Sequence, residues 1–157
     1  MNGLARTSES YTLYIVLLGA HAGLRVSEMT ALQWEDIDLG SATLKVVAGK
    51  GGKTARVNLS STLVEALEHV PLVKRNGYLL PARSRIAVYK RLEAACRVAK
   101  VKFKGVHALR HASGTRLHDE MGDLALVADH LRHNSLDTAR GYAKVNNAQL
   151  KKAVGDW

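Results

Sequence analysis

Residues 11–22 carry apolar side chains on nearly every side of a helix, a pattern typical of a helix that is buried all round. Ser10 stands directly before this segment and is a candidate N-cap. The most apolar part, residues 13–22, is too short to span a bilayer and contains His21, and no signal-peptide pattern begins at Met1. We therefore expect a cytoplasmic globular protein organised around this core helix, with no membrane partner.

The remaining patterns predict a mainly α chain with a small antiparallel β-sheet, an α+β fold. Gly23 ends the first helix, and residues 26–33 are predicted to form a second, short helix. Strands are predicted at residues 43–48 and 55–59, and the glycine-rich segment between them is typical of a hairpin with Lys50 near its tip. Further helices are predicted at residues 60–72 and 84–100, from His107 onward, after the candidate cap Asp123, and at residues 138–145 and 147–155.

The chain has 157 residues, of which 46% are hydrophobic, and this is enough for one domain whose core needs no disulfide. Cys96 is the only cysteine, which excludes an intramolecular disulfide and a four-cysteine zinc site. We expect a single domain over residues 1–157.

Positive charge is concentrated in the middle of the chain, where sixteen Lys and Arg residues stand against three acidic ones between Lys45 and Arg116. Such a field is typical of a surface that follows a phosphate backbone, although a basic domain without a nucleic-acid partner remains an alternative. Aromatic residues make up only 5%, which favours contact with a duplex backbone over base stacking. The residues expected to contact double-stranded DNA are Lys53, Arg85, Lys90, Arg91, Arg97, Lys102 and Lys104.

The helix predicted at residues 84–100 is amphipathic. Its charged face is expected to present Arg85, Lys90, Arg91 and Arg97 to the DNA backbone. Its apolar side is expected to hold Ile86, Tyr89, Leu92, Ala95 and Cys96.

Two imidazoles, a guanidinium and a phenol follow within a short region, on His107, Arg110, His133 and Tyr142. Gathered around one point, such groups suit an anionic phosphorus centre that needs charge neutralisation, proton transfer and a nucleophile. A phenol with a pKa of about 10 is ionised to only about one part in a thousand at neutral pH, a deficit of about 4 kcal/mol. Cations around a phosphorane would offset that deficit.

Arg25 stands at the corner between the first two predicted helices, where the backbone geometry is fixed. Glu28 lies three residues further, on the same helical face and close enough to orient a guanidinium. Taken alone, Arg25 fits an ordinary surface arginine at least as well.

Two other motifs are incomplete. A phosphate-binding loop ending at Thr54 would need a glycine where Val47 stands, and a helix where a strand is predicted. His107 and His111 have zinc-ligand spacing, but the metalloprotease motif needs a glutamate where Ala108 stands, and no third ligand is near in the sequence. We therefore expect no metal site and no bound cofactor.

Five segments together resemble the tyrosine recombinase, or phage integrase, family and occur in the family's order. They are residues 23–28, residues 49–53, residues 107–110, residues 131–135 and, nine residues after His133, Tyr142. Each match is short, but an ordered set that spans most of the chain is specific. The resemblance implies the fold and activity of the family's C-terminal catalytic domain.

The resemblance also implies roles for individual residues. Tyr142 would attack a DNA phosphodiester, leaving a 3′-phosphotyrosyl link and a free 5′-hydroxyl, without metal or ATP. His107 would transfer protons. The phosphate-oxygen donors would be Arg25, Arg110 and His133.

Lys50 would be the general acid for the leaving hydroxyl, although the neighbouring Lys53 could be confused with it. Glu28 matches the family's supporting acid near the first arginine. The chain departs from the family pattern at Arg132, where glycine is usual, and the added charge could alter the helix end or the DNA contact.

Integrases normally carry a DNA-clasping domain before the catalytic one, whereas here the first core helix begins about ten residues after Met1, so we expect no such domain in this chain. The implied partners are double-stranded DNA in the nucleoid of a bacterial host, further copies in a homo-oligomer, such as a tetrameric synapse, and accessory DNA-bending proteins. Residues 147–157 are the candidate for assembly in trans. A type IB topoisomerase and a non-catalytic basic DNA-binding module remain alternatives.

Overall fold

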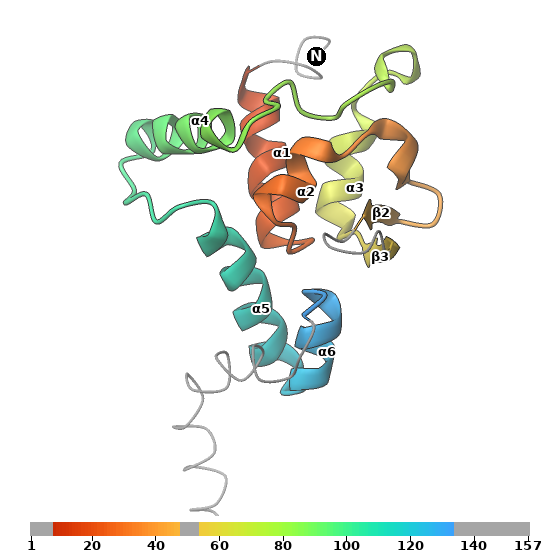
Figure 1. Ribbon diagram of the computed structural model, residues 1–157, viewed down its shortest axis with the longest axis vertical. Helices are drawn as coiled ribbons and strands as arrows, with labels where there is room; N and C mark the ends of the chain where they lie inside the picture. The colour runs from red at the N-terminus through yellow and green to blue at the C-terminus, as the bar shows by residue number, and fades with distance from the viewer. Residues whose placement is uncertain (1–7, 48–53, 134–157) are drawn as a thin grey trace, which may run out of the picture.

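The computed structural model describes residues 8–47 and 54–133 (Figure 1), and their arrangement confirms a mainly α fold with a small antiparallel sheet. The helices and strands are α1 (Ser8–Ala20), α2 (Val26–Ala31), the 3₁₀ helix η2 (Trp34–Asp36), β1 (Ile37–Asp38), β2 (Thr43–Val47), β3 (Thr54–Asn58), α3 (Ser61–Glu68), the 3₁₀ helix η3 (Leu72–Lys74), α4 (Arg85–Val98), α5 (His107–Met121) and α6 (Leu124–His130).

Helix α1 lies at the centre of the fold and packs against α2, α3, α4 and α5 (Figure 1). Ile15 and Leu18 are fully buried, and Tyr14 and Leu17 nearly so, as expected for a helix that is apolar on nearly every side. The helix begins at Ser8, so the prediction of Ser10 as its N-cap is wrong. Ser10 lies inside the first turn and is buried.

The sheet has the order β1-β2-β3, with both pairs antiparallel. Leu44 pairs with Val57, and both are buried in the core. The predicted hairpin of β2 and β3 is thereby confirmed. Strand β1 was not predicted, because a strand of two residues has no alternation that a sequence pattern could reveal.

Two serines cap the helices that follow the sheet. The Ser60 hydroxyl accepts a hydrogen bond from the Leu63 amide at the start of α3, and the Ser84 hydroxyl accepts one from the Ala87 amide at the start of α4. Both helices lie within their predicted ranges, and α3 stops before Pro71.

The buried side of α4 is only partly the predicted one. Leu92 is buried and Cys96 packs against the core, as expected, whereas Ile86 is 67% exposed and Tyr89 is also exposed. Val88, which was not predicted, is fully buried. Helix α4 packs against α1 and α2 along the line of Val88 and Leu92, and Ile86, two residues before Val88, points almost the opposite way.

Helices α5 and α6 form a smaller second core, in which Val127 and Leu131 are buried against Leu117 and Leu124. Asp123 caps α6 as predicted, because its Oδ1 accepts hydrogen bonds from the amides of Ala125 and Leu126 at 2.7 and 3.3 Å. The helices predicted at residues 138–145 and 147–155 lie outside the described residues. No helix in the described ranges is both long enough and apolar enough to cross a membrane.

Candidate active site

The corner between α1 and α2 presents Arg25. Gly23 takes a φ of +62°, which turns the chain after α1, and Arg25 then serves as the N-cap residue of α2. Glu28 accepts hydrogen bonds from the Arg25 amide at 2.7 Å and from Arg25 Nη1 at 3.2 Å. The Glu28 side chain is 6% exposed and that of Arg25 is 42% exposed, so a buried carboxylate holds a guanidinium that reaches the surface. The predicted contact between these two residues is confirmed.

Arg110 is the largest fully buried side chain among the described residues, at 1% exposure. It lies in the first turn of α5, and its two terminal nitrogens donate hydrogen bonds to the carbonyls of Gly23 and Leu131. These carbonyls belong to the α1–α2 corner and to the end of α6. Arg110 therefore joins three parts of the chain that are far apart in sequence.

His133 follows α6, and its amide donates to the Ala128 carbonyl at 2.8 Å. Its pKa is lowered, first by burial and then by the positive groups of Arg110, Arg25, Arg132 and His107. The geometry places these residues around one point, as the sequence predicted. Arg25 and His107 line the same pocket, and Arg110 donates to the carbonyls two residues before Arg25 and two residues before His133. Their catalytic roles stay predictions.

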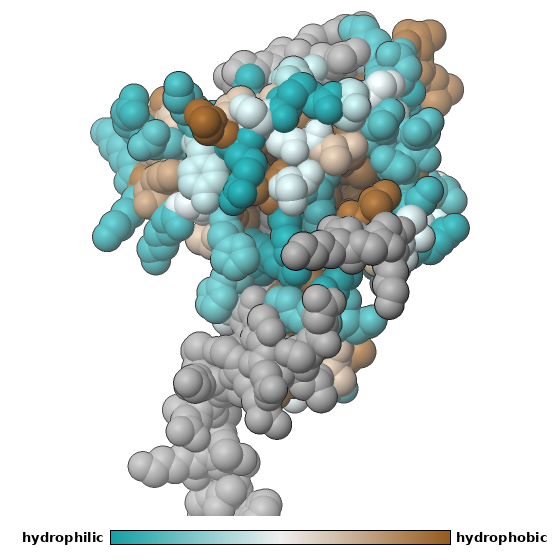
Figure 2. Space-filling view, viewed as in Figure 1, coloured by the Kyte–Doolittle hydropathy of each residue, from teal (hydrophilic) through white to brown (hydrophobic). Residues whose placement is uncertain are grey.

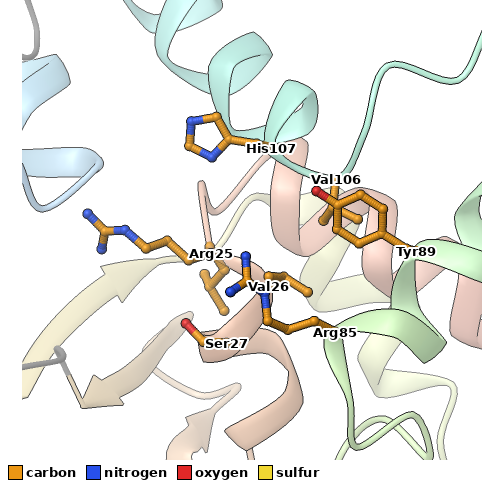
Figure 3. A pocket seen from close by; sticks show the side chains of 8 residues that line it. Arg25, Val26, Ser27, Arg85, Tyr89, Val106 and His107 are labelled. Carbon is orange, nitrogen blue, oxygen red and sulfur yellow. The ribbon is translucent and has the colours of Figure 1, made fainter.

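A pocket of about 250 Å³ opens beside this point and receives side chains from three helices (Figure 3). Arg25 and Arg85 come from the starts of α2 and α4, and His107 comes from the start of α5. The Tyr89 hydroxyl is directed toward Val106 at the entrance to α5 (Figure 3). The lining consists of Leu24, Arg25, Val26, Ser27, Arg85, Tyr89, Val106 and His107.

Ser27 and Tyr89 are lining residues that sequence reasoning did not assign to the site. The signal for Tyr89 was its position four residues after Arg85, which places both on one helical face. Phe103 packs edge-to-face against Tyr89, with 5.8 Å between ring centroids. Phe103 belongs to the loop after α4, which also carries the exposed Lys102 and Lys104.

The basic residues of α4 do not share the single charged face that was expected. Arg85 lines the pocket described above, whereas Lys90 and Arg91 line a separate groove beside Thr12 of α1. Arg91 also lies over the Tyr11 ring, at 5.7 Å from its centroid. Hydrophilic side chains nevertheless cover much of the outer side of α4 (Figure 2).

Ser113 and His130 form a further polar pair beside the site that the sequence did not reveal. The Ser113 hydroxyl lies 2.8 Å from His130 Nε2. The pKa of His130 is lowered, first by burial and then by the charges of Arg132 and Arg110, against an opposing effect of Asp129.

Three predicted site residues, Lys50, Lys53 and Tyr142, lie outside the described residues. Their roles remain predictions. Within the described ranges, no group of three or more His, Cys, Asp or Glu side chains is placed to hold a metal ion, and the expectation of a metal-independent site also stays a prediction.

Comparison with known proteins places these features in a family context. The profile described as "Phage integrase family" matches residues 1–149. Tyrosine recombinase XerC of Chlorobaculum parvum is 34% identical over an alignment of 148 residues, and the match covers 83% of this chain and 44% of that protein. The crystal structure of XerA recombinase superposes with a TM-score of 0.79 at 25% identity, covering 97% of this chain and 58% of that one.

A second solved structure is that of XerH site-specific recombinase bound to difH substrate in a pre-cleavage complex. It has a TM-score of 0.76 and 27% identity, and the match covers 94% of this chain and 47% of that one. The chain spans about half the length of the curated relatives that it matches.

Proposed function

The chain belongs to the phage integrase family, and from this premise we propose that it is the catalytic domain of a site-specific tyrosine recombinase that cleaves and rejoins duplex DNA. The observation that carries the proposal is the placement of Arg25 and His107 in one pocket, with Arg110 bonded to the carbonyls two residues before Arg25 and two residues before His133. Positive groups around one point suit the phosphate of a DNA strand, whose transition state carries extra negative charge. A related recombinase, XerH, has been solved with its difH substrate.

Arg25 and Arg110 play different parts in this proposal. Arg25 reaches the pocket with a partly exposed guanidinium that Glu28 holds in place, so it can donate hydrogen bonds to a phosphate oxygen. Arg110 is buried and fixes the carbonyls of Gly23 and Leu131 while adding its charge to the site. His133 and His107 complete the set as a phosphate-oxygen donor and a proton-transfer group.

In the proposed reaction the Tyr142 phenol gives its proton to His107, and its oxygen attacks the phosphorus. A bond forms between that oxygen and phosphorus while the bond to the 5′ oxygen breaks, and Lys50 supplies the proton that the departing 5′ oxygen needs. The resulting phosphotyrosine preserves the energy of the broken ester, so a 5′-hydroxyl can reverse the step without ATP. The basic residues flanking the pocket, Arg85 above all, would hold the neighbouring phosphates.

Strand exchange requires two DNA sites, so the proposal includes assembly of several copies on DNA, with residues 147–157 as the segment that joins them. Accessory DNA-bending proteins are a further proposed partner. In a bacterial host the protein would act in the cytoplasm, at the nucleoid.

Two other functions are distinguishable from this one. A type IB topoisomerase would use the same phosphotyrosine but relax plasmids of arbitrary sequence at low protein concentration. A non-catalytic DNA-binding module would show only the salt dependence of phosphate contacts, and Tyr142→Phe would change nothing. The family match and the XerC and XerA relatives favour recombination over both.

The experiment is a capture of covalent protein–DNA adducts. The protein is mixed with a library of nicked duplexes whose sequence around the nick is randomised, with a metal chelator present, and adducts are resolved on a denaturing gel and sequenced. The nick lets the short 5′-hydroxyl fragment leave, which traps the phosphotyrosine. We expect a shifted band that is enriched in particular sequences and absent with Tyr142→Phe.

An adduct that persists in Tyr142→Phe would contradict the assignment of the nucleophile. The absence of any adduct would contradict the proposal once a DNA-clasping domain fused to the chain has secured tight binding and an adduct still fails to form. An adduct without sequence preference would favour the topoisomerase.

A further inference from the structure

Arg132 occupies a backbone conformation that suits glycine. It has a φ of +55° directly after Leu131, the C-cap residue of α6. Helices commonly end with a residue in this left-handed region, and a side chain other than that of glycine or asparagine is disfavoured there. An arginine at this position must therefore be stabilised by what its side chain contacts.

The Arg132 side chain turns inward rather than toward solvent. It is 7% exposed, and its Nη2 lies 2.8 Å from Glu28 Oε2 and 3.1 Å from the Gly23 carbonyl, to which it donates. Its Nη1 donates to the His130 carbonyl at 2.9 Å. Its Nε is buried without a hydrogen-bond partner among the described residues. Among the described residues, the guanidinium therefore makes its hydrogen bonds through its two terminal nitrogens and not through Nε.

Glu28 is shared between two arginines. Its Oε1 accepts from Arg25 Nη1 at 3.2 Å, and its Oε2 accepts from the Arg25 amide at 2.7 Å and from Arg132 at 2.8 Å. A carboxylate as buried as Glu28 needs a counter-charge. Without Arg132, Arg25 alone would have to supply it and would be drawn toward the interior, away from the pocket.

The Gly23 carbonyl is shared in the same way. It accepts hydrogen bonds from both Arg110 and Arg132, which reach it from α5 and from the end of α6. The segment that carries His133 is therefore tied to the α1–α2 corner by two guanidinium groups. Charge-assisted hydrogen bonds of this kind are stronger and more directional than neutral ones.

From these contacts we infer that Arg132 is a positioning residue, which clamps the end of α6 to the α2 corner through Glu28 and Gly23. The clamp fixes the place of His133 and supplies Glu28 with a permanent counter-ion, so that Arg25 can turn its remaining N–H groups to a ligand. The inference rests on the proposed function only for its effect on catalysis. The contacts that Arg132 makes with Glu28 and Gly23 do not depend on it. Arg132 itself is too buried to contact a DNA phosphate.

The test compares the wild type with Arg132→Gly, Arg132→Lys and Glu28→Gln in the full chain. Glycine adopts the positive φ without strain, so Arg132→Gly removes the clamp while leaving the helix end intact. Lysine keeps the charge but loses the planar fork that reaches Glu28, Gly23 and His130 together. Far-UV circular dichroism verifies the fold of each variant.

The first readout is the titration of His133 by NMR, which needs no DNA. The groups facing this imidazole are Arg110 from α5, Arg25 from the α2 corner, Arg132 beside it and His107 from the start of α5. Removing Arg132 takes away one of the positive charges that lower the pKa of His133, so we expect the titration of Arg132→Gly to move to higher pH. Arg132→Lys should restore most of the wild-type titration.

The second readout is the adduct assay on the most enriched nicked duplex. We expect Arg132→Gly to form the adduct at least about tenfold more slowly while its affinity for DNA changes less than about twofold, and Arg132→Lys to recover part of the rate. The effects of Arg132→Gly and Glu28→Gln should be non-additive in the double variant, because both remove the same contact.

An unchanged adduct rate and an unchanged His133 titration in Arg132→Gly would overturn the inference. The inference would also be overturned if Arg132→Gly bound DNA more weakly and its slope of log affinity against log salt fell by about one phosphate contact. Arg132 would then contact the DNA directly. If the wild type forms no adduct even with a DNA-clasping domain fused to it, the proposed recombination fails. The His133 titration and the coupling of Arg132 to Glu28 in urea unfolding then still decide whether the clamp exists.

Discussion

Gly23 and Leu131 are packed so closely that a Cβ atom on Gly23 would lie 2.6 Å from Leu131 Cδ2. Gly23 also has a φ of +62° and presents its carbonyl to Arg110 and Arg132. A larger residue at this position would strain the backbone and force Leu131 at the end of α6 to shift. The site depends on that fit, because Arg25 and His133 stand two residues beyond Gly23 and Leu131 respectively.

We predict that Gly23→Ala lowers the free energy of unfolding by about 2–4 kcal/mol. Strain in the left-handed backbone conformation contributes about 1–2 kcal/mol, and overpacking against Leu131 contributes the rest. Gly122→Ala is a matched control, because Gly122 has a φ of +66° but nothing lies within 4 Å of its added Cβ. It should cost only the backbone strain. Urea unfolding measures both, and equal losses would mean that Leu131 moves aside freely.

Arg110→Ala should destabilise the fold by about 2–5 kcal/mol. It leaves the Leu131 carbonyl without its donor, at about 1–3 kcal/mol, removes one of the two donors of the Gly23 carbonyl, and leaves a cavity where the buried side chain lay. A loss of activity in this variant would then include a structural part. Arg116→Ala on the same helix is the control, since Arg116 is 67% exposed in its ion pair with Glu120. Its unfolding midpoint should stay close to that of the wild type. Comparable shifts in both variants would contradict the bridging role of Arg110.

Local signals in the sequence were sufficient for many features of the fold. Asp123 and the serine at the start of α3 are capping residues by type, and the alternation of Leu44 and Val46 marks a strand. The contact of Glu28 with Arg25 follows from helical spacing alone. Each of these depends on neighbours within a few residues.

What the sequence could not reveal depends on packing between distant segments. Spacing placed Arg110 near His107, but only the closure of α6 on the α1–α2 corner turns Arg110 inward to two carbonyls. The side on which α4 is buried is likewise set by α1 and α2, so Ile86 was expected inside and lies outside. The contact of Arg132 with Glu28 joins residues 104 positions apart. No periodic pattern encodes such a pair.

Stability should fall as the pH drops below about 6.5, because the pKa of His130 is lowered in the fold by burial, Arg132 and Arg110. The unfolded chain then binds a proton that the folded chain resists. The stabilisation is complete above the unfolded pKa of His130 and is lost as the pH falls toward its folded pKa. His133, with a lowered pKa of its own, adds to the same trend.

Urea unfolding at pH 7.5 and pH 5 measures this dependence. His130→Gln keeps a partner for Ser113 but does not titrate, so it should flatten the curve between these two values. Asp38, whose pKa is lowered below its ordinary value of 3.8 chiefly by the backbone N–H of Ser41, titrates below this pH range. An undiminished slope in His130→Gln would show that another group carries the effect.

Two basic residues of α4 should differ in their effect on DNA binding. Arg85 lines the pocket with Arg25 and His107, whereas Lys90 lines the groove beside Thr12. We predict that Arg85→Gln weakens binding to a random duplex and lowers the slope of log affinity against log salt by about one contact, or about 0.9. Lys90→Gln, measured by fluorescence anisotropy under the same conditions, should leave that slope nearly unchanged. The reverse ranking would place the DNA along the groove between α1 and α4 rather than over the pocket.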